Sequence, residues 1–428
     1  MHLLQIASGN FFSTYGGGQV YVRNIVDEMV RQGEITLTII SFVETDGISE
    51  KEYRGCKLYE CEELDDEQML SLIKEIHPDV IHAHSHKGQA CRIGATLDIP
   101  VVVTSHHGGI VCPAGTLLNC KDEICQTTVS HQNCLKCCLR NIRTGLYWYP
   151  FMHLIPEKTY LKLGQWLQKK PFIPFITPIG DTALSIQNKQ EEWQNIIHNC
   201  TLMIAPSEAM KEAMVRNGLD AKIVKVIPHG IPLPSHPAPF PSTTNGIRFF
   251  YIGRICYVKG LHILLEAFHR LNDDQAELHL IGGTANKGER RYEARLRRKY
   301  QNDNRIVWHG KVAPNEVYDA IKDYHVSSSS AYLEAFGLNI AESLAMGKPV
   351  LATRCGGAEM QIEDGVNGWL VPTNNVEALR QKMEEIVHMS EEQLAQMAGK
   401  KKVVSIEEHC IELIKLYNTV YEKHNLSK

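Results

Sequence analysis

The chain has 428 residues, which is enough for two or three domains of about 150 residues each. With 43% hydrophobic and 22% charged residues, its composition excludes intrinsic disorder, collagen and coiled coil as the main architecture. The formal net charge is −4, from 45 basic and 49 acidic residues, so no positive field that would attract nucleic acid is expected.

The first part of the chain alternates strands and helices. A strand over residues 2–7 is followed by a glycine loop at 16–18 and a helix over 20–32, and the same rhythm continues to residue 104. The first eight residues look like a strand rather than a signal peptide, and no apolar run reaches about 18 residues. We therefore expect a cytoplasmic protein without a transmembrane helix, which begins with an open, parallel α/β domain.

Two features divide the rest of the chain. Residues 110–180 interrupt the rhythm with a cysteine-rich and then aromatic segment, which we interpret as an insertion. Six prolines between residues 228 and 247 indicate a linker, and a second α/β series runs from residue 248 to 371. We predict domains over 1–235 and 246–405, with a cleft between the carboxyl ends of their strands, where ligands of such sheets bind.

Three short motifs suit a diphosphate ligand, although each also has a plainer interpretation. Adjacent glycines at 16–18 would let backbone N–H groups approach a phosphate, or they form a flexible turn. Arg254 and Lys259 place two cations near the start of a helix, or they lie in a solvated loop. Glu334 and Glu342 flank a loop that enters a helix, where carboxylates could accept hydrogen bonds from sugar hydroxyls, or they are two surface glutamates.

The set of motifs, in this order, resembles the nucleotide-sugar glycosyltransferases of glycosyltransferase family 4. The resemblance implies the GT-B fold, in which two Rossmann-like domains face each other across a cleft, and it covers nearly the whole chain except the insertion. It also implies that a C-terminal helix, over 406–424, crosses back onto the first domain. The matching pieces are residues 16–18, 104–106, 226–230, 253–254 with 259–260, 334–342 and 364–368.

The resemblance also implies a role for each matching residue. Arg254 and Lys259 would neutralise the leaving diphosphate, and Glu334 and His106 would complete the catalytic set beside the sugar. Without a paired-aspartate motif for a divalent ion, no cofactor is expected to be required for catalysis. The residues expected to bind the donor are Gly17, Gly18, Val312, Phe336, Gly337, Leu338 and Glu342.

Some positions depart from the family pattern. Ala335 stands where proline is frequent, and His229 where asparagine is usual. His107 stands where aspartate is frequent, so that either His106 or His107 could face the donor, and we favour His106. His82, His84 and His86 would share one face of a strand, either as metal ligands or, as we favour, as residues at the edge of a sugar cleft or a turn.

The insertion holds six of the 13 cysteines, at positions 112, 120, 125, 134, 137 and 138. Cysteine spacing of this kind is typical of a structural zinc site or an iron–sulfur cluster, and free thiols or a local disulfide are the alternative. We predict Cys120, Cys125, Cys134 and Cys137 as the metal ligands.

The rest of the insertion is rich in aromatic residues over 146–156, followed by Lys162, Lys169 and Lys170. Such a segment either lies on a bilayer surface or forms a helical subdomain that packs on the first domain. The membrane interpretation suits an acceptor carried on a polyprenyl lipid, which many members of the family use, and it would place the protein on the inner face of the cytoplasmic membrane.

The resemblance predicts a retaining glycosyltransferase of the hexosyltransferase kind. It would move a hexose-type sugar from a UDP or GDP sugar to a glycan or glycolipid acceptor, in the synthesis of a bacterial surface polysaccharide. The alternative from another class is a catalytically silent protein of the same fold that binds a sugar nucleotide or a glycan. A phosphorylase of the same fold would need a pyridoxal lysine, and none is identifiable.

Overall fold

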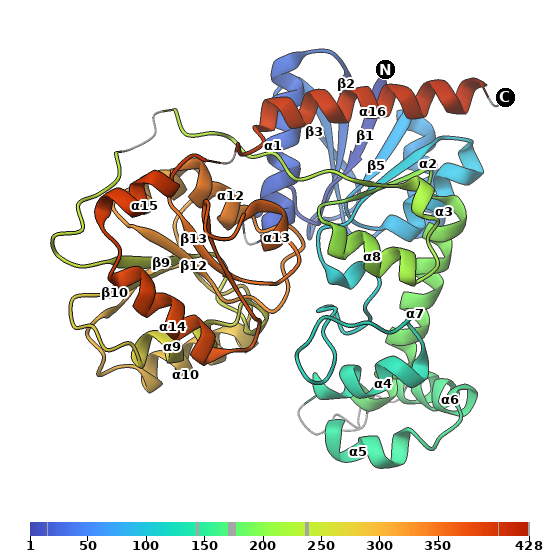
Figure 1. Ribbon diagram of the computed structural model, residues 1–428. Helices are drawn as coiled ribbons and strands as arrows, with labels where there is room; N and C mark the ends of the chain where they lie inside the picture. Colours follow the sequence, from blue (N-terminus) through green and yellow to red (C-terminus); the bar gives the residue numbers. More distant parts are fainter. Residues whose placement is uncertain (15, 143–144, 170–176, 236–238, 401, 427–428) are drawn as a thin grey trace.

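The computed structural model describes residues 1–14, 16–142, 145–169, 177–235, 239–400 and 402–426. Two α/β domains lie side by side, and a helical lobe extends from the first of them (Figure 1). Each domain is built on a predominantly parallel sheet covered by helices. The prediction of two Rossmann-like domains is therefore confirmed.

The first domain is built on an eight-stranded sheet in the order β3-β4-β2-β1-β5-β6-β7-β8. The strands are β1 (His2–Ile6), β2 (Thr36–Phe42), β3 (Ser49–Tyr53), β4 (Cys56–Cys61), β5 (Val80–Ala83), β6 (Val101–Thr104), β7 (Leu202–Ala205) and β8 (Val224–Val226). Its helices are α1 (Gly17–Gln32), α2 (Asp66–Ile76), α3 (Lys87–Leu97), α7 (Thr177–Asn199) and α8 (Glu208–Arg216), with short 3₁₀ turns η1 (Gly108–Ile110) and η2 (Ala221–Ile223). The central strands are apolar and buried, as expected for a sheet covered on both faces.

Two strands of this sheet are not predicted from the sequence, which indicates no strand between residues 43 and 64. There the structure has β3 and β4, which pair antiparallel at the edge of the sheet. β3 reads Ser-Glu-Lys-Glu-Tyr and its three central side chains are exposed. An edge strand with charged side chains has no apolar alternation to reveal it.

The second domain has a six-stranded parallel sheet in the order β11-β10-β9-β12-β13-β14. The strands are β9 (Arg248–Ile252), β10 (Glu277–Ile281), β11 (Ile306–Gly310), β12 (Val326–Ser329), β13 (Val350–Thr353) and β14 (Gly368–Val371). The helical elements are η3 (Tyr257–Lys259), α9 (Leu261–His269), α10 (Lys287–Lys299), η4 (Pro314–Glu316), α11 (Val317–Ile321), α12 (Leu338–Ala345), α13 (Ala358–Gln361), α14 (Val376–Val387) and α15 (Glu391–Met397).

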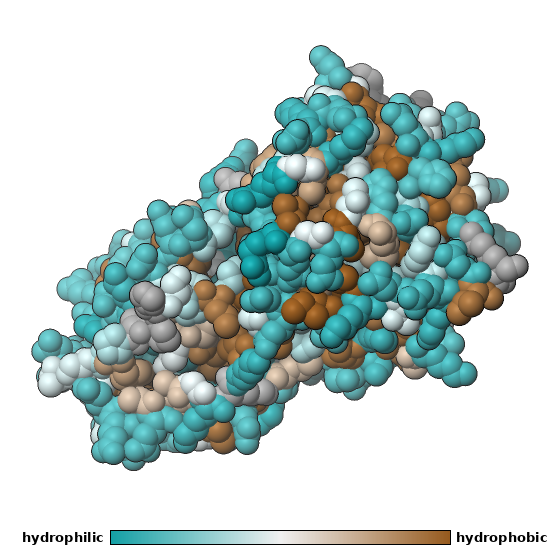
Figure 2. Space-filling model, turned by 90° about the horizontal axis from the view of Figure 1, so that it is seen from above, coloured by the Kyte–Doolittle hydropathy of each residue, from teal (hydrophilic) through white to brown (hydrophobic). Residues whose placement is uncertain are grey.

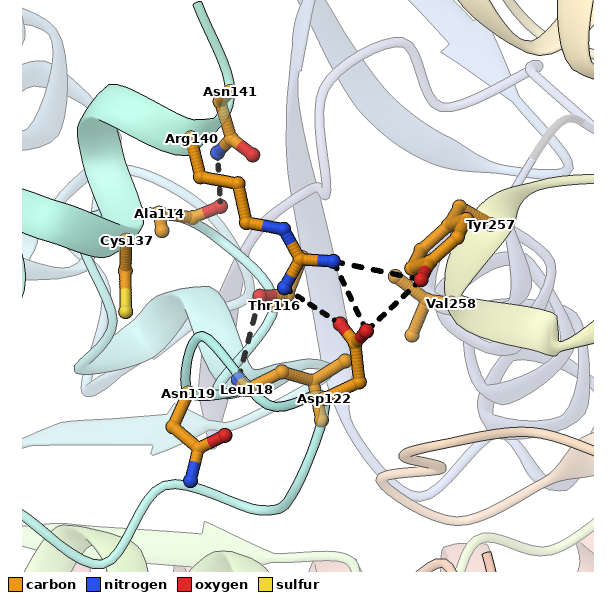
Figure 3. A pocket seen from close by; sticks show the side chains of 10 residues that line it. All are labelled: Ala114, Thr116, Leu118, Asn119, Asp122, Cys137, Arg140, Asn141, Tyr257 and Val258. Atoms are coloured by element: carbon orange, nitrogen blue, oxygen red, sulfur yellow. Dashed lines mark hydrogen bonds and ion pairs between the residues drawn. The ribbon is translucent and has the colours of Figure 1, made fainter. Parts of the chain in front are cut away.

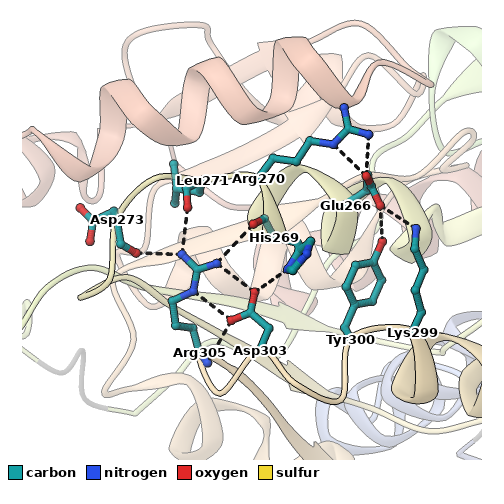
Figure 4. Close-up of polar contacts among 9 residues, drawn as sticks. All are labelled: Glu266, His269, Arg270, Leu271, Asp273, Lys299, Tyr300, Asp303 and Arg305. Carbon is teal, nitrogen blue, oxygen red and sulfur yellow. Dashed lines mark hydrogen bonds and ion pairs between the residues drawn. The ribbon is translucent and has the colours of Figure 1, made fainter.

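Two polar clusters hold the helices of this domain at one end of the sheet (Figure 4). Arg305 donates to the Asp303 carboxylate at 2.9 Å and to the backbone carbonyls of Leu271 and Asp273, also at 2.9 Å. Glu266 accepts from Lys299 at 2.6 Å and from the Tyr300 hydroxyl at 2.7 Å. These hydrogen bonds tie α9 and α10 to the loops beside them and leave the opposite end of the sheet for ligands.

A C-terminal helix, α16 (Ile406–Leu426), crosses back from the second domain and lies across the first (Figure 1). Its Tyr417 is fully buried and its hydroxyl lies 2.7 Å from Nδ1 of His82. At Gly230 a side chain would collide with α16, because a Cβ there would lie 2.4 Å from the Cβ of His409. The helix therefore ties the chain reversal at residue 230 to the core of the first domain.

The insertion forms the helical lobe, in which α4 (His131–Arg140) and α6 (Glu157–Gln168) pack against α7 and α5 (Gly145–Met152) packs against α4 (Figure 1). The lobe has an apolar core of its own, which includes Leu135, Leu139, Tyr160 and Ile186. The Tyr160 hydroxyl lies 2.7 Å from that of Thr182 and so links α6 to α7. Lys170 of the predicted basic segment lies outside the described residues.

The face seen in Figure 2 is mostly hydrophilic, with apolar side chains in scattered patches. Across the described ranges, no helix is both long enough and apolar enough to cross a membrane.

Candidate active site

The two sheets present their topological switch points to each other. In the first sheet, β2 to β4 lie on one side of β1 and β5 to β8 on the other, so the switch point is between β1 and β5. In the second sheet, the switch point is between β9 and β12 for the same reason. Ligands of open α/β sheets bind outside the carboxyl ends of the strands at such points. Arg254 follows β9 and Glu334 follows β12, while the glycine loop and His84 follow β1 and β5.

The glycine loop of the first domain touches the second domain. A Cβ on Gly17 would lie 3.2 Å from Cδ1 of Leu338, the first residue of α12. A Cβ on Gly18 would lie 3.1 Å from Cγ of His106, just beyond β6. Both distances are tighter than ordinary Cβ contacts, so Gly17 and Gly18 let the backbone of this loop pack closely against α12 and His106.

Lys259 and Glu334 form an ion pair on the second-domain wall. Glu334 is held in place by its backbone, because its N–H donates to the Cys355 carbonyl at 2.9 Å and its carbonyl accepts from Gly357 at 2.9 Å. Burial acts to lower the pKa of Lys259, but the Glu334 carboxylate outweighs it and raises that pKa overall. Lys259 is therefore a fixed cation at the carboxyl end of this sheet.

Arg254 lies beside this pair with its side chain 46% exposed. Its Nε is 3.5 Å from the Glu289 carboxylate, and its carbonyl accepts from the Tyr251 hydroxyl at 2.8 Å. The strand end that carries it depends on Gly282, where a Cβ would lie 1.9 Å from the carbonyl oxygen of Gly253. The backbone that carries Arg254 is thus held by close contacts, while its guanidinium remains accessible to solvent.

The start of α12 brings Phe336, Gly337 and Leu338 to the same wall. Gly337 has φ +92°, a conformation that favours glycine, and the Gln361 amide donates to the Phe336 carbonyl at 2.5 Å. With this carbonyl bound, the first N–H groups of the helix are the groups that an anion would meet.

Glu342 lies in the second turn of α12, and burial raises its pKa to about 7. It lies close enough to Tyr318 to raise the pKa of that hydroxyl further than burial alone does. Val312 packs in the same apolar cluster as Tyr318. Both predicted donor-binding residues, Glu342 and Val312, are therefore linked to Tyr318 on this side of the second domain.

His106 belongs to a buried chain of polar side chains. Nδ1 of His84 lies 2.9 Å from Nε2 of His106, and Nε2 of His84 lies 2.8 Å from the side-chain oxygen of Gln5. Burial lowers the pKa of both histidines well below 6.5, so both rings are neutral. Because the Gln5 oxygen can only accept, His84 carries its proton on Nε2, and His106 donates from Nε2 to His84. Nδ1 of His106 is therefore an acceptor, and it is buried without a partner among the described residues.

His107 turns away from this chain and caps the next turn. Its Nδ1 accepts from the N–H of Gly109 at 3.0 Å, and it stands before η1 as the N-cap. Of the two histidines, His106 is the one against Gly18.

Several residues of the cleft are not predicted as site residues from the sequence. The ring of Tyr21 stacks on His229 with centroids 3.9 Å apart, and its hydroxyl lies 2.7 Å from Nε2 of His409. His229 also faces Phe336, at 5.3 Å between ring centroids. The only signal in the sequence is the departure at His229, since the partners come from positions about 200 residues apart.

The three alternating histidines do not share a ligand. His82 lies 2.7 Å from the Thr104 hydroxyl as well as from Tyr417, and His84 binds His106 and Gln5. His86 turns to the Glu63 carboxylate at 2.7 Å. The edge-of-cleft interpretation fits this arrangement better than a metal triad.

The structure brings only part of the predicted cysteine site together. The sulfur atoms of Cys120 and Cys137 are 3.3 Å apart, while Cys125 lies 3.3 Å from the Thr127 hydroxyl. Burial, together with nearby Cys112 and Cys125, raises the pKa of Cys134 to about 11. Within the described part of the chain no group of three or more ligand side chains is arranged to hold a metal ion, so the metal site stays a prediction.

Comparison with known proteins agrees with this geometry. Residues 235–403 match the family model described as "Glycosyl transferases group 1". The chain is 32% identical over 157 residues to a sucrose synthase of Acidithiobacillus caldus, covering 33% of the chain and 20% of the relative. It is 23% identical over 211 residues to the putative colanic acid biosynthesis glycosyltransferase WcaL of Escherichia coli K12, covering 48% of the chain and 52% of the relative. The chain thus spans between a fifth and about half of the length of these curated relatives.

Solved structures match over nearly the whole chain. Anabaena HepE in complex with UDP and glucose has a TM-score of 0.66 at 16% identity, covering 98% of this chain and 99% of that one. A sucrose-phosphate synthase of Thermosynechococcus elongatus also has a TM-score of 0.66 at 16% identity, covering 99% and 100% of the two chains. The chain therefore has the GT-B glycosyltransferase fold, and its second domain matches the family of glycosyl transferases group 1.

Proposed function

We propose that the protein is a retaining glycosyltransferase that uses a nucleoside diphosphate sugar. The observation that carries the proposal is the pair of cations, Arg254 and Lys259, at the switch point of the second sheet, with Glu334 bound to Lys259. Opposite them, the glycine loop contacts both α12 and His106. The diphosphate would bind Arg254 and Lys259. The sugar would lie beside Glu334 and His106, and the ribose beside Glu342.

The chemistry follows from where charge develops. As the bond between the sugar and the diphosphate breaks, negative charge gathers on the diphosphate and positive charge on the sugar ring. Arg254, Lys259 and the first N–H groups of α12 stabilise the leaving group more in the transition state than in the ground state. These groups would do the work of a divalent ion, so we propose transfer without a metal cofactor.

The donor is proposed to be a UDP or GDP sugar with a hexose-type sugar. The matched HepE structures contain UDP, UDP and glucose, or UDP-glucose, which supports a uridine nucleotide as the first candidate. The acceptor is proposed to be a glycan or a polyprenyl-linked glycan of a bacterial surface polysaccharide. The similarity to the putative colanic acid biosynthesis glycosyltransferase WcaL and to an O-antigen chain mannosyltransferase of Escherichia coli supports that class.

The helical lobe carries an exposed apolar surface that suits a lipid-linked acceptor. Twelve large apolar side chains of the described residues are exposed, and six of them are Leu146, Tyr147, Trp148, Phe151, Leu154 and Trp166. Exposed Lys158, Lys162 and Lys169 lie in the same helices or directly after them. Apolar side chains interleaved with lysines favour an anionic bilayer surface, so we propose that the protein works as a peripheral membrane protein at the inner face of the cytoplasmic membrane.

Nucleotide binding tests the proposal first. Purified protein is heated with UDP, GDP, ADP or CMP, with and without EDTA. A nucleotide at 100 times its dissociation constant should add about 2.7 kcal/mol to the stability of the folded state. We expect UDP or GDP to stabilise the native protein in EDTA, and the exposed control Lys222→Ala to respond alike. Stabilisation that disappears in EDTA would reject metal-free binding, and no stabilisation by UDP or GDP would favour a silent fold.

A further inference from the structure

A second pocket lies where the helical lobe meets the second domain (Figure 3), with a volume of about 240 Å³. Its lobe side is lined by Thr116, Asn119, Asp122, Arg140 and Asn141, and its far side by Tyr257. We propose that this pocket binds a neutral sugar residue of the acceptor. The proposal rests on the proposed glycosyltransferase function, and it names a substrate class for a place outside the donor site.

The walls of the pocket are fixed by hydrogen bonds between the two domains. Arg140 donates to both oxygens of the Asp122 carboxylate, at 2.8 and 3.0 Å. The Tyr257 hydroxyl donates to the same carboxylate at 2.9 Å, and Figure 3 shows the three side chains converging from α4, from a loop of the lobe and from η3. The Tyr257 ring also stacks on His262, with centroids 5.0 Å apart. The pocket is thus a formed site, since its polar groups already hold their positions.

The pocket adjoins the reaction centre on both sides. Tyr257 and Val258 line it, and the next residue, Lys259, is the partner of Glu334. On the lobe side, Leu117 stands between two lining residues, and its Cβ lies 2.4 Å from the Cβ position of Gly108. The Cβ position of Gly108 is also 3.2 Å from Cδ2 of Leu333, the residue before Glu334. A ligand in this pocket would therefore lie near the segments that carry Lys259 and Glu334.

The charges of the lining select a neutral ligand. Arg140 and Asp122 form an ion pair at 2.8 Å, so that their charges offset each other. A phosphate would meet the Asp122 carboxylate as well as the guanidinium, whereas a polyol meets no unbalanced charge. Sugar hydroxyls both donate and accept. The nitrogen of the Asn141 amide lies 3.4 Å from the Ala114 carbonyl, and its oxygen can accept from a sugar hydroxyl, whereas the Asn119 amide is bound within its own turn.

Size and shape agree with one sugar residue. Pockets for drug-sized ligands have volumes of about 300 to 1,000 Å³, so about 240 Å³ suits a smaller polar unit. Tyr257 is 41% exposed, so part of its side chain remains accessible to a ligand in the pocket.

The test uses the native chain and a variant that fills the pocket. Asn141 is exposed just after α4, so Asn141→Trp can fill the pocket without disturbing a core, and Gln132→Trp at another exposed position of α4 is the matched control. The probes are the methyl glycosides of glucose, galactose, mannose and N-acetylglucosamine, observed by saturation-transfer NMR. Saturating UDP or GDP, whichever stabilises the protein, keeps them out of the donor site.

We expect at least one methyl glycoside to bind the native protein and the Gln132→Trp control, with binding weakened about tenfold or more in Asn141→Trp. Tyr257→Leu should weaken it similarly, because it removes the ring from the other domain. No glycoside signal with the native protein, or equal signals in Asn141→Trp and the control, would overturn the proposal.

The measurement of stabilisation by nucleotides distinguishes failure of this proposal from failure of the proposed glycosyltransferase function. Nucleotide stabilisation with no effect of Asn141→Trp on glycoside binding rejects the pocket and leaves the glycosyltransferase standing. Glycoside binding that depends on position 141, without stabilisation by any nucleotide, supports a sugar site and counts against the glycosyltransferase.

Discussion

Nδ1 of His84 lies 2.9 Å from Nε2 of His106, and this contact decides which nitrogen of His106 can receive a proton. With the Gln5 oxygen facing Nε2 of His84, Nδ1 of His106 is left as an acceptor, and we propose that it accepts from a hydroxyl of the donor sugar. His84 is thus a positioning residue, which acts on the sugar only through His106.

The first prediction concerns His84. His84→Phe removes the acceptor for His106 Nε2–H and frees the His106 ring, so turnover should fall about tenfold or more while the affinity for UDP stays unchanged. The tautomer of His106, read from ¹⁵N chemical shifts of labelled histidine, should also become mixed. A variant that keeps a single His106 tautomer and normal turnover would contradict the role of His84.

The second prediction concerns pH. We propose that Glu342 accepts hydrogen bonds from the ribose of the donor, which requires its carboxylate form. Its pKa of about 7 means that it gains this form between pH 6 and 8. The affinity for UDP should therefore rise with pH over this range, by up to about tenfold. The terminal phosphate of UDP itself titrates near pH 6, so the readout is the difference between the native protein and Glu342→Gln, measured by calorimetry. Identical pH profiles would contradict the assignment.

The third prediction concerns metal in the lobe. The Cys120 and Cys137 sulfur atoms, at 3.3 Å, are farther apart than the roughly 2.05 Å of a disulfide bond and closer than the about 3.8 Å between two ligands of tetrahedral zinc. If Cys120, Cys125, Cys134 and Cys137 bind zinc or an iron–sulfur cluster, protein purified without chelator should contain the metal. Cys134→Ser should lose it, whereas Cys56→Ser, in β4, should keep it. Elemental analysis that finds neither zinc nor iron in the native protein would remove this hypothesis.

The fourth prediction concerns the exposed apolar side chains of the lobe. The native protein should float with liposomes that contain phosphatidylglycerol, and the triple variant Tyr147→Ser, Phe151→Ser, Leu154→Ser should not, because each buried apolar side chain contributes about 1.5–3 kcal/mol. The matched control is Ile48→Ser, Leu233→Ser, Ile411→Ser, which removes exposed apolar side chains elsewhere. Failure of the native protein to float, or equal flotation of both variants, would count against membrane binding through the lobe.

The sequence could predict those parts of the fold and site that depend on local pattern. Buried parallel strands such as β6 and β7 are short apolar runs, and Arg254, Lys259, Glu334 and Glu342 follow strand ends at the spacings of the family pattern. These elements therefore follow from spacing and from family resemblance together.

Contacts between distant segments could not be predicted in the same way. Tyr21, His229 and His409 meet because α16 crosses back onto the first domain, and no local pattern links the three positions. The contact of Tyr257 with Asp122 joins a domain to an insertion whose own fold has no counterpart in the resemblance. The β3 strand has a polar sequence, so its place in the sheet depends on its pairing with β4.

The most direct test of the proposed function is the release of nucleoside diphosphate from a sugar donor. UDP-glucose or GDP-mannose is incubated with native protein in EDTA, with Lys259→Ala and Arg254→Ala as variants and Lys222→Ala as the exposed control. We predict that the native protein and the control release UDP or GDP, and that each cleft variant is slower by about 10²-fold or more, as for loss of one preorganised charge-stabilising group. Near-normal release by both cleft variants, or no release by the native protein, would contradict a glycosyl transfer that depends on Arg254 and Lys259.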